Sequence, residues 1–140
     1  MAHILILEDE ISLSAYWREL LEWRGHQVTC CTRVDQAMKQ LQSTDFDLII
    51  TDMVIKAPSA KPSPGGLSLI SNRAIGKMPR VPILGVSGYR PSSQAWGEKL
   101  SLLEIAKEMG ADLTLYKPIS PEALMDAVDT LLNQAHTDDA

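Results

Sequence analysis

The chain has 140 residues, of which 45% are hydrophobic and 22% charged, and its formal net charge is -5. This length allows one domain with a buried core but hardly two. An acidic chain without a Lys/Arg-rich stretch is not typical of proteins that bind nucleic acid, because phosphate contacts need clustered basic side chains. No apolar run approaches the roughly 20 residues of a membrane span, and Met1 stands too close to the first apolar run for a signal peptide.

Short apolar runs alternate along the chain with longer segments of helical period. The predicted strands are His3–Leu7, Gln27–Cys30, Asp47–Thr51, Val81–Val86 and Leu113–Tyr116. The predicted helices are Ile11–Arg24, Val34–Gln42, Leu67–Ile75, roughly Ser92–Met109, and a last helix that opens at Ser120-Pro121-Glu122. We assign residues 1–135 to one domain and residues 136–140 to a polar, frayed tail.

Two features of the predicted elements concern aromatic and thiol side chains. Trp17 and Trp23 both fall in the first helix, and we expect them to lie in the core or to be half-buried. Cys30 and Cys31 are neighbours in a strand, which indicates two reduced thiols and not a disulfide. We therefore expect a cytoplasmic protein.

Strands and helices that alternate in this way predict an α/β fold with a parallel sheet covered by helices on both faces. The commonest small arrangement is a doubly wound, flavodoxin-like sheet of five strands in the order 2-1-3-4-5. Its ligand crevice lies where strands 1 and 3 meet. Two segments, Met53–Gly66 and Gly88–Glu98, are long for loops of such a fold, and long loops at this edge are commonly functional.

Chemically useful side chains follow four of the five predicted strands. They are the acids Glu8-Asp9-Glu10, then Asp52, then Ser87-Gly88, and finally Lys117-Pro118. The carboxyl ends of parallel strands meet at one edge of the sheet, so these groups should gather there. Because like charges repel, the acids must raise their pKa values or hold a cation. Acids, a hydroxyl and an ammonium at one edge match the needs of metal-assisted phosphoryl transfer.

Each motif alone also has an ordinary structural explanation. Asp9 or Ser12 could cap the first helix, Asp52 could be a turn residue, Ser87-Gly88 a turn, and Lys117-Pro118 the stop of a strand. The joint placement of all four at one edge favours a functional site.

The chain resembles the receiver domains of two-component response regulators from His3 to about Gln134, through the four motifs above in this order. The resemblance implies that Asp52 accepts a phosphoryl group from a histidine kinase or a histidine phosphotransfer protein. It further implies that Asp9, Asp52 and the backbone carbonyl of Val54 ligate Mg²⁺, with Glu8 bound directly or through a water. No other cofactor is implied.

The same resemblance gives roles to the groups after the last two strands. Ser87 would donate to one phosphoryl oxygen, Lys117 would pair with another, and the peptide bond between Lys117 and Pro118 would be cis. The expected function is that of a phosphoacceptor switch that signals by contact with a downstream protein. It would not be a turnover enzyme on an external substrate, and a homodimer is possible. An alternative is a pseudo-receiver, an interaction module on the same fold without phosphoryl turnover.

The sequence departs from the family pattern at positions that bear on signalling. Thr114 stands where receivers commonly carry an aromatic residue, and Tyr116 should point to the sheet face opposite Lys117. Lys56 occupies the position where receivers usually carry a proline. Because these departures concern the signalling surface, the sequence supports the phosphoryl chemistry better than the standard signalling output. We also hypothesise that Val54 and Tyr89 restrict water at the site and slow the loss of phosphate.

Other functions on this fold lack their chemistry here. A flavodoxin needs a phosphate loop after the first strand, where the acids would repel the phosphate of FMN. A haloacid-dehalogenase-type phosphatase would need a second acid at position 54, where Val54 stands.

Overall fold

The central element is a five-stranded parallel sheet in the order β2-β1-β3-β6-β7. The structure is a computed structural model that describes residues 2–56, 62–88, 107 and 110–138. The strands are β1 (His3–Leu7), β2 (Gln27–Cys31), β3 (Leu48–Asp52), β6 (Ile83–Ser87) and β7 (Leu113–Tyr116). In order along the chain these are the five predicted strands, so the predicted fold and its strand order 2-1-3-4-5 are confirmed.

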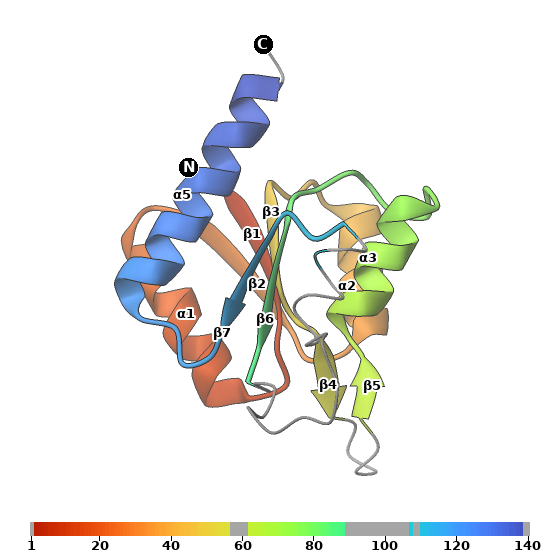
Figure 1. Cartoon of the computed structure of the whole chain (residues 1–140), viewed down its shortest axis with the longest axis horizontal. Helices are drawn as coiled ribbons and strands as arrows, with labels where there is room; N and C mark the ends of the chain where they lie inside the picture. The colour runs from red at the N-terminus through yellow and green to blue at the C-terminus, as the bar shows by residue number, and fades with distance from the viewer. Residues whose placement is uncertain (1, 57–61, 89–106, 108–109, 139–140) are drawn as a thin grey trace, which may run out of the picture.

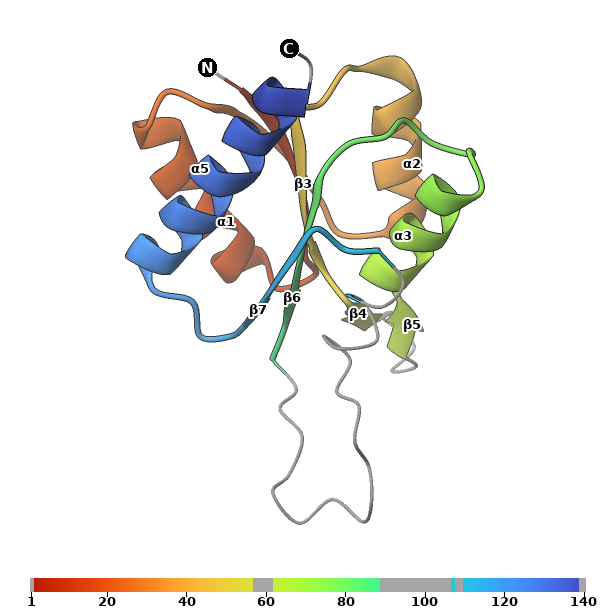
Figure 2. The ribbon, with the colours of Figure 1, turned by 45° about the horizontal axis from the view of Figure 1, so that its top comes forward.

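Helices cover both faces of this sheet. The helices are α1 (Ile11–Trp23), α2 (Val34–Ser43), α3 (Gly66–Ala74) and α5 (Pro121–Asp138). Figures 1 and 2 both show α1 and α5 together on one face and α2 and α3 on the other. The helix predicted over Ser92–Met109 lies outside the described residues, apart from Lys107.

The core consists of two apolar layers, one on each face. Side chains alternate along β1, so that Ile4 and Ile6 pack with Trp17 and α5, whereas Leu5 and Leu7 pack on the α2 and α3 side. All five residues of β3 are buried, and so are four of the five in β1. Strands covered on both faces read as continuous apolar runs, and this is why the sequence located them well.

Most element ends lie within one residue of the prediction, and three larger differences stand out among the described residues. The long segment after Asp52 contains a two-stranded antiparallel hairpin, β4 (Val54–Lys56) with β5 (Pro62–Pro64), instead of a plain loop. β6 begins two residues after the predicted start, past Pro82, which has no N–H to give to a strand pairing. α5 extends to Asp138, so residues 136–138 are helical and not a frayed tail.

The expected start of α5 is confirmed by its cap. The Ser120 hydroxyl accepts a hydrogen bond of 3.1 Å from the backbone N–H of Ala123. This satisfies one of the donors that the first turn of a helix leaves without a partner.

The expectation for the two tryptophans of α1 is right for one and wrong for the other. Trp17 is buried, with 1% of its surface exposed, but Trp23 is 88% exposed. Trp23 follows the buried Leu21 by two residues, which places it on the opposite side of the helix. Both cysteines are free thiols, Cys30 exposed and Cys31 buried. Within the described part of the chain, no helix combines the length and the apolar character that a membrane crossing requires.

Candidate functional site

The register of the sheet brings the four predicted motifs to one edge. Leu7, the last residue of β1, pairs with Thr51, and Asp52 pairs with Val86 one step further along. Ser87 pairs with Tyr116 at the end of β7. Glu8, Asp52, Ser87 and Lys117 therefore follow or end adjacent parallel strands at the same level, because parallel strands place their carboxyl ends together.

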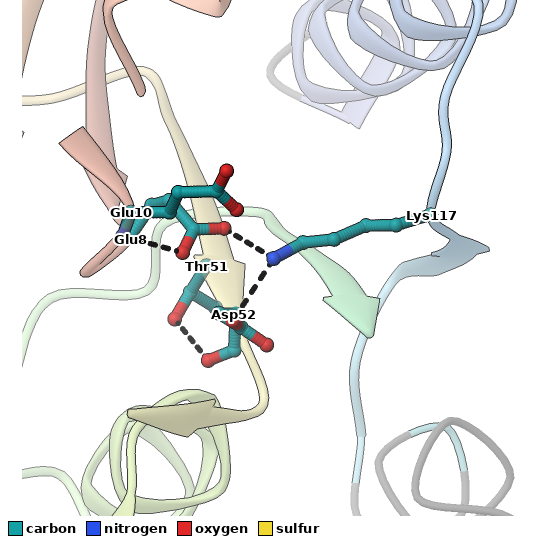
Figure 3. A network of polar contacts seen from close by, with 5 residues as sticks. All are labelled: Glu8, Glu10, Thr51, Asp52 and Lys117. Carbon is teal, nitrogen blue, oxygen red and sulfur yellow. Dashed lines mark hydrogen bonds and ion pairs between the residues drawn. The ribbon is translucent and has the colours of Figure 1, made fainter. Parts of the chain in front are cut away.

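Lys117 is the centre of the polar contacts at this edge. Its Nζ donates to Oε1 of Glu8 at 2.5 Å and to Oδ2 of Asp52 at 3.1 Å. Figure 3 shows the lysine side chain reaching from the end of β7 to both acids. The backbone N–H of Lys117 donates to the carbonyl of Ser87 at 2.8 Å, and the Lys117–Pro118 bond is cis, as predicted. The ammonium also lies 5.8 Å from the centre of the Trp17 ring.

Glu8 is buried completely, although it carries an ionisable group. Burial raises the pKa of its carboxyl to about 7, and the hydrogen bonds from Lys117 and from the backbone of Glu10 offset this only in part. For Lys117 burial lowers the pKa, but the nearby Glu8 and Asp52 outweigh it and hold the pKa above its ordinary value. The ammonium is thus the charge that makes a buried carboxylate tolerable at this edge.

Three carboxylates meet at this edge with one ammonium. One oxygen from each of Glu8, Asp9 and Asp52 lies within 4.8 Å of the others. Asp52 is 9% exposed and Asp9 is half-buried, so all three are partly or fully removed from water. The charges do not balance, and hard carboxylate oxygens are the ligands that Mg²⁺ prefers. The residues present therefore fit a divalent cation.

The position of Val54 suits the remaining oxygen ligand that the resemblance implies. Val54 opens β4 two residues after Asp52 and pairs with Pro64 of β5. Pro64 has no N–H, so this strand partner cannot donate to the Val54 carbonyl. The role of the carbonyl as a ligand stays a prediction.

Ser87 ends β6 next to the lysine, and Gly88 follows it. Ser87 is 3% exposed, and a Cβ on Gly88 would come within 3.7 Å of Cδ of Lys117, which is ordinary contact. Tyr89 of the water-exclusion hypothesis, the side chain of Val54 and most of the Gly88–Glu98 segment lie outside the described residues.

Met53, a buried methionine directly after Asp52, was not predicted to matter from the sequence. Met53 has none of its surface exposed, and its side chain fills the space beside two glycines. A Cβ on Gly66 would lie 2.1 Å from Cε of Met53, and one on Gly85 would lie 2.8 Å from the same atom. The Met53 backbone is held by Val86 and Gly65, each through a hydrogen bond of 3.0 Å. A glycine inside a predicted strand was the signal that could have shown this close approach.

The departures at the end of β7 are as expected. Thr114 pairs with Gly85 in the sheet. A Cβ built on Gly85 would lie 3.7 Å from Cγ2 of Thr114. Tyr116 packs against the apolar layer of α2 and α3, whereas Lys117 reaches the acids and Trp17. The two neighbours thus point to opposite faces of the sheet.

Comparison with known proteins agrees with this geometry. The response regulator receiver domain family matches residues 4–129, and the chain belongs to this family. It is 30% identical over 131 residues to the transcriptional regulatory protein BaeR of Escherichia coli O6:H1. The aligned region covers 94% of this chain and 48% of BaeR. It is 25% identical over 136 residues to the transcriptional regulatory protein CpxR of Escherichia coli K12. This aligned region covers 97% of this chain and 51% of CpxR.

Solved structures share the fold at lower identity. The signal receiver domain of a putative Luxo repressor protein from Vibrio parahaemolyticus has a TM-score of 0.81 at 18% identity, over 99% of this chain and 95% of that one. A CheY-like receiver domain protein from Methanospirillum hungatei JF-1 has a TM-score of 0.79 at 20% identity, over 99% and 98%.

The chain spans about half the length of the curated relatives that it matches. These relatives are described as transcriptional regulatory proteins. The expectation that nucleic acid is not a partner therefore finds no support in them.

Proposed function

We propose that the chain is a phosphoacceptor switch in which Asp52 takes a phosphoryl group from a histidine kinase or a histidine phosphotransfer protein. The observation that carries this proposal is the double contact of the Lys117 ammonium with Glu8 and Asp52, inside a cluster of three carboxylates. An aspartate that must attack an anionic phosphoryl group needs positive charge close by, and this arrangement supplies it.

The cation site would be formed by Glu8, Asp9, Asp52 and the backbone carbonyl of Val54. Mg²⁺ bound there would neutralise charge on the phosphoryl oxygens as the group is transferred. Receiver domains carry such an ion as a family, and the donor set here consists of hard oxygens. Mg²⁺ keeps several waters when few protein ligands bind it, which leaves room for the incoming phosphoryl group.

Asp52 would act as the nucleophile. One of its carboxylate oxygens forms the new bond to phosphorus, while the P–N bond to the donor imidazole breaks and its electron pair leaves with the imidazole. Lys117 binds one of the transferred oxygens, and the Ser87 hydroxyl donates to another. Both side chains sit at strand ends, which fixes their positions before the phosphoryl group arrives.

The output would pass through contact with a downstream protein. Receiver domains are signalling modules and do not turn over an external substrate. Because Thr114 replaces the usual aromatic residue, the change that a partner reads would not run through an aromatic side chain at that position. A cytoplasmic location accords with a histidine kinase as the donor.

The test is intact-mass analysis after incubation with acetyl phosphate and Mg²⁺. Wild type should gain the mass of one phosphoryl group, and Asp52→Asn should gain none. Asp35→Asn, which removes an exposed acid from the first turn of α2, should be modified like wild type. Chelation of Mg²⁺ should abolish the adduct.

An unmodified wild-type chain, with acetyl phosphate and with a cognate kinase alike, would overturn the proposal. The pseudo-receiver interpretation would then replace it.

A further inference from the structure

Trp17 brings an aromatic face to the ammonium on which the proposed phosphoryl chemistry depends. Nζ of Lys117 lies over the Trp17 ring, 5.8 Å from its centre. This distance falls within the roughly 6 Å over which an aromatic ring attracts a cation, and indole attracts cations more strongly than the other aromatic side chains. Trp17 is 1% exposed and the Lys117 side chain is 17% exposed, and removal from water strengthens such an attraction.

Both partners of this contact are anchored in the same apolar layer of the core. Trp17 packs in the layer between the sheet and the helices α1 and α5, together with Ile6 of β1 and Val128 of α5. Ile119, two residues after the lysine, packs against this layer as well. A ring held in a close-packed core keeps its place, so it can serve as a fixed point for the ammonium.

The ring differs from the other partners of the ammonium because it takes no part in the reaction. Two of the three N–H groups of Nζ donate to Glu8 and Asp52, as Figure 3 shows. In the proposed function both acids change, since Mg²⁺ draws on their oxygens and Asp52 becomes an acyl phosphate. Indole offers no lone pair, so Mg²⁺, which takes oxygen ligands, does not compete for it.

A lysine whose two acids are drawn to a metal ion needs another constraint. Its four-carbon stem is flexible, and an unrestrained lysine has one of the largest rotamer entropies of all side chains. Phosphoryl transfer is fastest when the positive group is in place before charge develops, because a group aligned beforehand needs no reorganisation during the reaction. The face of an aromatic ring supplies such a constraint without holding the ammonium back from a phosphoryl oxygen.

We propose that Trp17 is a positioning residue that keeps the Lys117 ammonium at the phosphoacceptor edge while Glu8 and Asp52 bind Mg²⁺ and the phosphoryl group. The proposal rests on the proposed function for the reaction and on the contact of ring and ammonium for the device. Leucine or phenylalanine would also fill an apolar core at position 17, but leucine has no aromatic face and phenylalanine has a weaker one. The order Trp, Phe, Leu is therefore expected in the measurements that follow.

The first test follows the ε-methylene protons of Lys117 by NMR in the full chain with isotope-labelled lysine, and Lys117→Arg assigns the signal by its loss. The ring current of Trp17 should shift these protons upfield, less so in Trp17→Phe and not in Trp17→Leu. Addition of Mg²⁺ should leave the upfield shift in place. A wild type without the shift, or a shift that Mg²⁺ removes, would overturn the proposal.

The second test measures by intact mass how fast acetyl phosphate modifies Asp52. Trp17→Leu should lower the rate at saturating Mg²⁺ by about 10-fold, the equivalent of one desolvated contact between cation and ring, and Trp17→Phe should lower it less. The Mg²⁺ concentration at half-maximal rate should change less than about twofold, because the ring does not touch the ion. Leu21→Val is the matched control and should keep the wild-type rate, since Leu21 is buried in the same layer but lies one turn further from the site.

The third test separates an effect through Lys117 from damage to the core. A double-mutant cycle on urea unfolding compares Trp17→Leu in the wild type and in Lys117→Met. Without the ammonium, the effect of Trp17→Leu on the unfolding equilibrium constant should be smaller by about 10-fold. Should Trp17→Leu not fold, Trp17→Phe carries each comparison in the same direction.

A residue that only fills the core would give equal effects in both backgrounds of the cycle. That result, or a Trp17→Leu variant that is modified at the wild-type rate, would overturn the proposal. A wild-type chain that forms no adduct would overturn the proposed function and the positioning role together. The NMR signal needs no phosphoryl donor and would still decide whether the ring holds the ammonium, so the two failures are distinguishable.

Discussion

At the scale of single residues, the site depends on one ammonium among three carboxylates. Lys117 contacts the buried Glu8 and the less buried Asp52, so it is the counter-charge of both acids, and in the proposed function it would also bind a phosphoryl oxygen. A buried acid of this kind is tolerated only with a partner. The acids that would bind a cation therefore lower the stability of the fold while no cation is bound, as is common at functional sites.

A buried hydroxyl in α1 gives a first prediction. Ser14 is 5% exposed, and its Oγ has no hydrogen-bond partner among the described residues. Ser14→Ala should therefore raise the free energy of unfolding by about 1 kcal/mol, because it removes an unsatisfied polar group and improves helix propensity. Thermal unfolding measures the effect.

The control is Ser12→Ala in the same helix, where the hydroxyl is exposed and only the propensity term applies. If Ser14→Ala lowers the melting temperature, the hydroxyl has a partner and this argument is wrong.

A histidine at the other end of the sheet gives a prediction about pH. His26 is half-buried, its Nδ1 accepts a hydrogen bond of 3.2 Å from the N–H of Ala2, and burial lowers its pKa. A pKa lowered by folding means that the unfolded chain binds the proton more readily. The contribution of His26 to stability is thus complete above its unfolded pKa of about 6.5 and is lost as the pH falls through its folded pKa.

Urea unfolding at pH 7.5 and at pH 5.5 tests this prediction. Wild type should lose more stability between the two values than His26→Gln, which cannot take up the proton. The acids titrate in both proteins, so the difference between them isolates His26. Equal losses would contradict the assignment.

At the scale of elements, the sequence predicted the described strands of the sheet and the helices that cover it to within about one or two residues at most ends, and it missed the hairpin after Asp52. β1 has the predicted bounds because a strand buried between helices is an apolar run with clear ends, and the half-buried β7 has its predicted bounds as well. The β4–β5 hairpin was missed because its strands have three residues each and two prolines lie in β5, which argues against a strand. Burial was predicted for Trp23 because tryptophan is usually buried. Its position two residues after the buried Leu21, however, turns it toward the solvent side of the helix.

The candidate site was predictable for a related reason. Strand order and strand ends decide which side chains meet, and both can be read from apolar runs and the residues that follow them. The contact of Lys117 with both acids could not be read in this way, because it depends on how far a long side chain reaches. Met53 was missed because its burial depends on glycines that are distant in sequence.

An arginine joins three elements at the edge opposite the site. Arg73 of α3 donates to the carbonyl of Val81 at 2.9 Å, to Asp112 at 2.7 Å and to the carbonyl of Gly110. Asp112 in turn accepts from the N–H of Ile83 at 2.8 Å, so α3, β6 and the segment before β7 share one network. Only 16% of the Arg73 side chain is exposed.

Removal of this side chain should be costly. Arg73→Met should lower the free energy of unfolding by about 2–4 kcal/mol, because it leaves two carbonyls and a carboxylate without their donor. Arg73→Lys should recover only part of the loss, since an ammonium lacks the planar fork of donors. The midpoint of urea unfolding measures both variants.

The matched control is Arg33→Met. Arg33 pairs with Asp35 on the surface, with 60% and 64% of the side chains exposed, so its loss should stay below about 1 kcal/mol. Equal effects of Arg73→Met and Arg33→Met would show that the network contributes nothing beyond a surface ion pair.

At the scale of the whole molecule, the proposed cation site predicts that the stability of the fold depends on Mg²⁺. An ion that binds the folded chain and not the unfolded one stabilises it by mass action, by about 2.7 kcal/mol when its concentration is 100 times the Kd. Relief of repulsion among Glu8, Asp9 and Asp52 is the physical source of this stabilisation. Mg²⁺ should therefore raise the melting temperature in proportion to the logarithm of its concentration above the Kd, and chelation should reverse the shift.

Asp9→Asn should reduce this shift strongly, because it removes one of the three carboxylates while the fold keeps its core. Asp35→Asn, at an exposed acid on α2, should leave the shift unchanged. Since the measurement needs no phosphoryl donor, it separates the cation site from phosphoryl transfer. An Asp9→Asn variant that responds to Mg²⁺ as wild type does would mean that the ion binds elsewhere, and the three carboxylates would then need another explanation for their closeness.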